Sequence, residues 1–169
     1  MTVRRMNAMA LLTGISLILF VIEMQVPPPL PVPGVKLGLA NVVTVYAVCR
    51  FRPGEALMIL LARIFLAAVF AGQAASLLYS LTGGLFCLAG MFCLKRFLSP
   101  SRLWLCSLIG AVLHNTGQLT AASLLIGTDS VFAYFPLLAL TGAAAGLFTG
   151  FLAQQMLRRR LYVSREGMG

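Results

Sequence analysis

The sequence has few of the residues that carry out enzyme chemistry. Its 169 residues include four acidic side chains, among them a single aspartate, Asp129, and one histidine, His114. It has no C-x-x-C pair, no Walker A loop, no neighbouring pair of carboxylates and no nucleophile beside a base. A structural metal site typically needs three or four Cys, His or carboxylate ligands. We therefore expect no catalytic residues and no metal site in this chain.

Charge of either sign is also scarce. Charged residues make up 10% of the chain and hydrophobic residues 60%, whereas a soluble domain has about 25% charged and about 45–50% apolar residues. Hydrophobic runs long enough to cross a bilayer recur along the chain, and the gaps between them are too short for a soluble domain. The composition predicts an all-α integral membrane protein with one transmembrane domain, residues 1–157, and a short basic tail, residues 158–169.

The hydrophobic runs predict a bundle of six transmembrane helices. A span needs about 20 residues, so the apolar stretch 56–94 must hold most of two spans. The expected spans are residues 6–26, 35–51, 54–71, 74–94, 103–126 and 131–157.

The basic residues predict the orientation of this bundle. With six spans, every lysine and arginine except Lys36 and Arg63 falls on the same side. The positive-inside rule then places both termini in the cytoplasm. The net charge of +9 thus reflects topology and anionic lipid headgroups, and we expect no nucleic-acid partner.

Polar residues gather at one depth of the predicted bundle, from the middle of the membrane outward. A charge near the bilayer centre costs about 2.5–3.5 kcal/mol, so each needs a reason. The set is Glu23, Lys36, Asn41, Arg63, His114, Asn115 and Gln118. A few polar groups among apolar walls are typical of a small-molecule site. Two cations, and a third if the histidine is protonated, against one glutamate favour an anionic ligand.

These residues also have structural interpretations. Glu23 could neutralise Lys36 or Arg63 as a buried pair. Asn41 and Gln118 could form hydrogen bonds between helices, and the lone histidine could be an ordinary core residue. The sequence leaves open whether Arg63 contacts a ligand or only pairs with Glu23.

Prolines are concentrated in one predicted loop, since five of the eight lie in residues 27–33. Proline restricts the backbone, so this segment can cover a cavity mouth at little entropic cost. We expect Pro29, Pro31, Pro33 and Gly34 to form a lid, although the loop could simply connect two spans.

Small residues spaced four apart predict two helix contact surfaces. We expect Gly142, Gly146 and Gly150 to pack inside the bundle, because such residues let helices approach closely. Ala10 and Gly14 could pack internally or could dock a partner subunit.

Four segments give the chain a family likeness: PPPLPVPGVKLGLANVVT, LLARIFLAAVFAG, SLTGGLFCLAGM and SLIGAVLHNTGQLTAA. Through them it resembles the Gx transporter family, also labelled heptaprenyl diphosphate synthase component I. That family is similar to the substrate-binding S-components of energy-coupling-factor (ECF) vitamin transporters, with six helices, a lid after the first helix and an outward-facing site. The resemblance implies the plasma membrane of a bacterium. The signature positions that it implies are Pro31, Gly34, Lys36, Gly38, Asn41, Arg63, His114, Asn115 and Gln118.

The resemblance implies a transporter for a vitamin-like or nucleotide-like anion. A flavin (riboflavin, FMN or FAD) is the first candidate, because family members resemble proteins encoded beside flavin-based extracytosolic electron-transfer systems. No cofactor other than this cargo is expected. Implied partners are the lipid bilayer and an energy-coupling membrane subunit with its ATPases, or a second copy of the chain.

Two alternatives stay open. The chain could be a quinone-binding or anchoring subunit of an extracytosolic electron-transfer system, or an accessory subunit in isoprenoid metabolism. We expect no enzyme activity from the chain alone, since a prenyl diphosphate synthase needs aspartate-rich motifs to hold Mg²⁺. The single aspartate lies in a predicted external loop.

Overall fold

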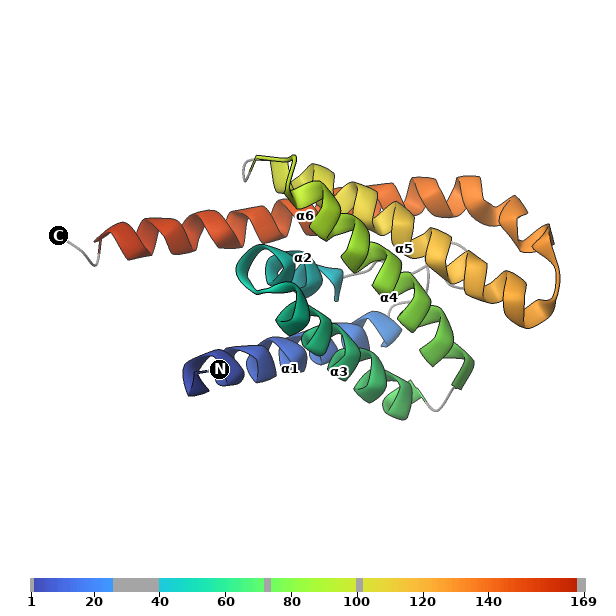
Figure 1. The fold of residues 1–169 in the computed structure, drawn as a ribbon, viewed down its shortest axis with the longest axis horizontal. Coiled ribbons are helices and arrows are strands. Elements are labelled where there is room, and N and C mark those ends of the chain that lie inside the picture. The colour runs from blue at the N-terminus through green and yellow to red at the C-terminus, as the bar shows by residue number, and fades with distance from the viewer. Residues whose placement is uncertain (1, 26–39, 72–73, 100–101, 167–169) are drawn as a thin grey trace.

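The computed structural model describes residues 2–25, 40–71, 74–99 and 102–166, which form helices and short connections (Figure 1). The elements in chain order are α1 (Val3–Gln25), α2 (Asn41–Arg50), α3 (Pro53–Ala71), α4 (Ala74–Lys95), α5 (Leu103–Ile126), the short 3₁₀ helix η2 (Asp129–Tyr134) and α6 (Phe135–Glu166).

These helices follow the predicted spans closely. α5 has the predicted bounds, and α1, α3 and α4 begin and end within three residues of theirs. The first part of the predicted second span lies outside the described residues. α6 differs most, because it continues to Glu166. Residues 158–166, which we predicted as a tail, are therefore part of the last helix.

The connection between α5 and α6 shows why the chain turns there. Gly127 ends α5 with φ 73°, a left-handed conformation that glycine favours, and its N–H bonds to the carbonyl of Ser123. The Thr128 side chain then accepts the N–H of Ser130 at the start of η2. Pro136 lies in the first turn of α6, where a missing N–H costs nothing.

By length and composition, four helical segments in the described part of the chain could each cross a bilayer: Val3–Gln25, Pro53–Phe70, Leu77–Lys95 and Asp129–Arg158. Large apolar side chains on these segments, such as Phe65 and Leu140, are exposed, as lipid-facing residues are. The structure thus indicates a membrane protein.

The other two helices fall short of this criterion for different reasons. α5 has 24 residues but carries His114, Asn115 and Gln118, which lower its mean hydropathy. α2 has 10 described residues, about 15 Å of helix, against a hydrocarbon core of about 30 Å. Six crossings and the membrane orientation therefore stay predictions. The start of α1 and the end of α6 lie toward the same end of the bundle, at the left in Figure 1, as an even number of crossings requires.

α2 is the central helix of the hydrophobic core. Residues 42–48 are all buried, so this helix has no polar face to expose. Val45 and Val48 share one core cluster with Met91 of α4 and Ala153 of α6. At the end of α2, Lys95 Nζ donates to the Val48 carbonyl at 2.7 Å, which satisfies a carbonyl that the helix leaves unpaired.

Glycines bring α4 and α5 into backbone contact. A Cβ on Gly83 would lie 2.8 Å from the main-chain oxygen of His114, and a Cβ on Gly117 would lie 2.8 Å from that of Thr82. Real Cβ atoms essentially never come this close to a backbone atom, so the two helices can touch only because both positions are glycine.

α5 and α6 meet in the same way. A Cβ on Gly146 would lie 2.8 Å from Cα of Leu108, and a Cβ on Gly150 would lie 2.7 Å from Cα of Trp104. A Cβ on Gly142 would collide with the side chain of Asn115. The predicted internal packing of these three glycines is confirmed.

Candidate functional site

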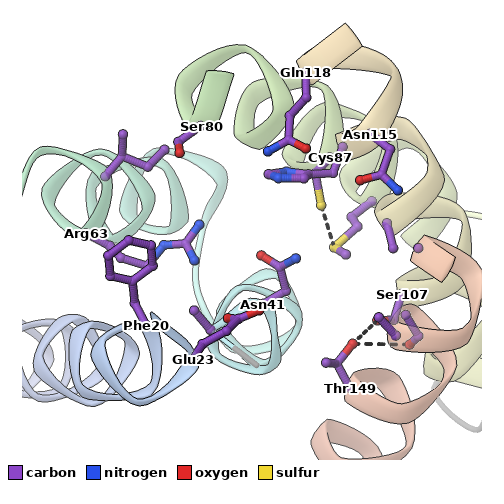
Figure 2. Close-up of a pocket in the computed structure, with 18 of the residues that line it drawn as sticks. Phe20, Glu23, Asn41, Arg63, Ser80, Cys87, Ser107, Asn115, Gln118 and Thr149 are labelled. Atoms are coloured by element: carbon purple, nitrogen blue, oxygen red, sulfur yellow. Dashed lines mark hydrogen bonds between the residues drawn. The ribbon is translucent and has the colours of Figure 1, made fainter. Parts of the chain in front are cut away.

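A cavity of about 80 Å³ lies among α1, α2, α3, α4, α5 and α6 (Figure 2). Six of the seven predicted site residues line it: Glu23, Asn41, Arg63, His114, Asn115 and Gln118. The seventh, Lys36, lies outside the described residues, as do Gly38 and the predicted lid residues Pro29, Pro31, Pro33 and Gly34. Residues that are far apart in the chain, on four helices, are thus brought together around one space.

One wall of the cavity carries the two charges. Glu23 of α1 and Arg63 of α3 are 7% and 8% exposed, and both side chains extend toward the cavity in Figure 2. The Glu23 carboxylate lies near enough to act electrostatically on the Arg63 guanidinium. Intramembrane charges usually pair in this way, so the structural interpretation of Glu23 fits the geometry.

Arg63 nevertheless has donor capacity left over. Its Nε is buried and has no hydrogen-bond partner among the described residues. A buried donor without a partner costs about 1–3 kcal/mol, and a guanidinium can give a carboxylate or phosphate two parallel hydrogen bonds. An anionic group in the cavity would recover this cost.

The opposite wall is the middle of α5. His114 and Gln118 are four residues apart and therefore share a face of the helix. Gly83 of α4 makes room for both, because a Cβ there would lie 2.8 Å from Gln118 Cγ and 3.0 Å from His114 Cε1. This role of Gly83 could not be predicted from the sequence, because a glycine pair in a membrane helix indicates close helix packing without naming the partner.

Asn115 links this wall to α6. Its Nδ2 donates a hydrogen bond to the main-chain oxygen of Leu138, next to Gly142, which has no side chain to obstruct it. Because a carbonyl oxygen can only accept, the nitrogen of the amide must face Leu138. The Asn115 oxygen then points toward the cavity, as Figure 2 shows.

Two buried hydroxyls that we did not predict also belong to the polar lining. Ser107 of α5 and Thr149 of α6 are each 1% exposed and lie 3.1 Å apart, oxygen to oxygen. Thr149 Oγ1 also lies 3.2 Å from the Gly146 carbonyl, to which it donates. Serine and threonine in a helix often bond only to their own backbone, so the residue types alone are a weak signal. The better signal is the glycines about one turn away, because they bring α5 and α6 close enough for the two hydroxyls to meet.

Apart from Ser80 of α4, the rest of the lining is apolar or contains sulfur. Phe20, Ile64 and Ala67 face the space, and Cys87 Sγ lies 4.0 Å from Met91 Sδ on α4. Apolar walls with a small number of convergent polar groups are typical of small-molecule sites. Among the described residues, no three His, Cys, Asp or Glu side chains come together as metal ligands.

The predicted docking residues lie on the open surface of α1. Ala10 is exposed, and a Cβ on Gly14 would have no atom within 4 Å. In the described part of the chain neither residue is packed against another helix as closely as the glycines of α4, α5 and α6 are. The surface is therefore available to a lipid or a second protein.

Comparison with known protein families gave a match to heptaprenyl diphosphate synthase component I over residues 12–156. The chain belongs to this family. The match runs from α1 into the second half of α6 and includes every residue of the cavity lining. The family predicted from the four sequence segments is thus confirmed. No curated protein and no solved structure matches the chain.

Proposed function

We propose that this protein is the substrate-binding membrane subunit of a transporter for a small anionic molecule, similar to the S-components of ECF transporters. The observation that carries the proposal is the cavity itself, where a buried arginine faces amide and hydroxyl side chains and has a donor without a partner among the described residues. Its polar lining holds one carboxylate, Glu23, beside Arg63. That chemistry suits binding by hydrogen bonds, and we propose that the chain alone is not an enzyme.

Transport against a gradient would need energy from a partner, because the sequence has no ATPase motif. We expect the partner to be an energy-coupling membrane subunit with its ATPases, docked on the α1 surface around Ala10 and Gly14. Small residues on an exposed helix allow close approach of a second helix. A second copy of this chain is the alternative occupant. The plasma membrane of a bacterium, with both termini in the cytoplasm, belongs to the same proposal.

The proposed cargo is a vitamin-like or nucleotide-like anion, and a flavin such as FMN is the first to test. Its phosphate would meet Arg63 or Lys36, and its ring would lie among Phe20, Ile64 and Ala67. The cavity of about 80 Å³ is smaller than the roughly 300–1,000 Å³ typical of small-molecule sites. A flavin therefore requires the helices to move apart, whereas a compact anion needs less movement.

Mass spectrometry of small molecules that co-purify with the protein tests the proposal. The matched control is Arg63→Gln, purified in the same detergent. We expect an anionic compound that is enriched with the original protein and depleted with the variant. A flavin would colour the preparation yellow. Equal amounts of every compound in the two preparations would contradict anion binding at Arg63.

The family description favours a second candidate, an accessory subunit in the synthesis of prenyl diphosphates. In that case Arg63 would contact the diphosphate of a prenyl chain, and the enzyme chemistry would belong to a partner. Membranes from cells with and without this chain separate the candidates. Cells without the chain would lose long-chain prenyl diphosphate if it has the accessory role. Failure of the Arg63→Gln variant to correct that loss when it is expressed in these cells would support the accessory role over transport.

A further inference from the structure

We infer that the ligand of this cavity must carry an N–H or O–H donor as well as its anionic group, because two side chains across the cavity from Arg63 present acceptor oxygens to it. The inference rests on the proposed function, in that a small anion binds between α3 and α5. It narrows the class of anion by asking which lining side chains donate hydrogen bonds to the cavity and which accept them.

Asn115 offers an acceptor to the cavity. A neutral amide has two N–H donors on its nitrogen and an acceptor oxygen, and here the nitrogen is held by the carbonyl of Leu138 on α6. The amide cannot rotate to present its nitrogen without breaking that bond. The oxygen is left on the cavity side, where Figure 2 shows it.

Ser107 offers a second acceptor, for a related reason. A hydroxyl has one hydrogen, and Thr149 donates its own to the main-chain oxygen of Gly146. The 3.1 Å contact between the two hydroxyls must then use the hydrogen of Ser107. The Ser107 oxygen, which lines the cavity, then has a lone pair free to accept and no further hydrogen to donate. Asn115 and Ser107 thus each donate one hydrogen to α6.

Arg63 has the opposite character, since a guanidinium has only donors. It enters the cavity from α3, on the far side from Asn115 and Ser107 (Figure 2). A ligand that spans the space meets the guanidinium at one end. At the other end it meets the oxygens of Asn115 and Ser107, with the amide of Gln118 beside them. An anion whose remaining polar atoms only accept would leave the Asn115 and Ser107 oxygens desolvated and unpaired.

This polarity separates the classes of cargo. A carboxylate or phosphate joined to a ring imide or amide has both features, and the flavin ring contains such an imide N–H. A prenyl diphosphate or a quinone has acceptors alone. The structure therefore favours a heterocyclic anion with an N–H edge over both.

Matched pairs of anions that differ only in this hydrogen test the inference. The compact pair is orotate and its N,N′-dimethyl derivative, and the larger pair is carboxymethylflavin and its N3-methyl derivative. Geranyl diphosphate and naphthoquinone sulfonate serve as anions without a donor. Binding to the full-length protein in detergent is measured by titration calorimetry, with the melting temperature as a second readout. For at least one pair we expect methylation to weaken binding roughly 10- to 100-fold.

Variants show whether the discrimination comes from the named oxygens. Ser107→Ala should bring the affinities of the two members of a pair closer together, and Asn115→Ala should do so further if it folds. Arg63→Gln should instead weaken both members by a similar factor. Equal binding of the two members, or Arg63-dependent binding of geranyl diphosphate or the quinone sulfonate, would overturn the inference and leave the proposed function standing. No binding of any of the six compounds would reject both.

Discussion

Replacing Arg63 with glutamine removes the one guanidinium among the described residues that line the cavity. The change keeps a polar side chain of similar reach and takes away the charge. A hydrogen bond to a charged group contributes about 1.5–3 kcal/mol, so the loss of one such contact should weaken anion binding roughly 10- to 150-fold. Arg63 is 8% exposed, and water can therefore do little to replace the lost contact.

The competing interpretation assigns Arg63 to Glu23 alone. Both side chains are more than nine-tenths buried, and removing one partner of a buried pair destabilises a protein by about 3–5 kcal/mol because the other charge is left uncompensated. Arg63→Gln would then act on the fold. The double variant with Glu23→Gln would restore stability, since neither charge remains.

The four proteins, original, two single variants and double variant, separate these interpretations when affinity and melting temperature are measured on each. We expect the double variant to recover most of the melting temperature and to keep the weak binding of Arg63→Gln. Recovery of the original affinity in the double variant would refute our reasoning, because binding would not then require the guanidinium.

Three further predictions follow from the helix contacts and the charges. Gly142→Ala should overpack the contact with Asn115, which should cost about 1–3 kcal/mol of folding free energy and lower the melting temperature. It should also weaken ligand binding, because Asn115 would be displaced. The control Gly54→Ala, where a Cβ would meet nothing within 4 Å, should change neither property, and unchanged binding in Gly142→Ala would show that Asn115 is not needed in its present place. Gly14→Leu should abolish uptake in cells while leaving ligand affinity in detergent intact, and a parallel loss of affinity would assign this residue to the fold. A cysteine introduced at Asp129 should react with a membrane-impermeant maleimide added outside intact cells. A cysteine introduced at Leu98 should react only after permeabilisation, and external labelling there would contradict the predicted orientation.

The helices could be predicted from the sequence because hydrophobic length is a local property. α5 has the predicted bounds, and the residue that follows them, Gly127, terminates the helix. The meeting of Glu23, Arg63 and Gln118 around one cavity could also be anticipated, since each is costly in a membrane and all lie at a similar depth.

What the sequence could not give was the identity of each neighbour. The hydrogen-bonding direction of Asn115 depends on the carbonyl of Leu138, which is 23 residues away on another helix. The contact between Ser107 and Thr149 depends on how closely α5 and α6 approach. Periodicity tells which face a residue shares, but the partner across the interface is set by the packing of the whole bundle.

The backbone contacts of α5 with both of its neighbours have a mechanical consequence. Where helices touch through glycine, no side chain at the contact can change rotamer to absorb a displacement. We therefore expect α4, α5 and α6 to move as one rigid body, which includes the acceptor oxygens of Asn115 and Ser107. Among the described residues α1 has no such glycine contact, and Gly84 of α4 meets α3 only through the side chains of Leu60 and Ile64. An ion pair between α1 and α3, Arg5 to Glu55 at 3.4 Å, is partly exposed at the end of the bundle. When a cargo larger than the present cavity enters or leaves, we expect α1 and α3 to move rather than α4, α5 and α6. Arg63 lies on α3, so the charge that binds the ligand would move together with the helices that open the cavity.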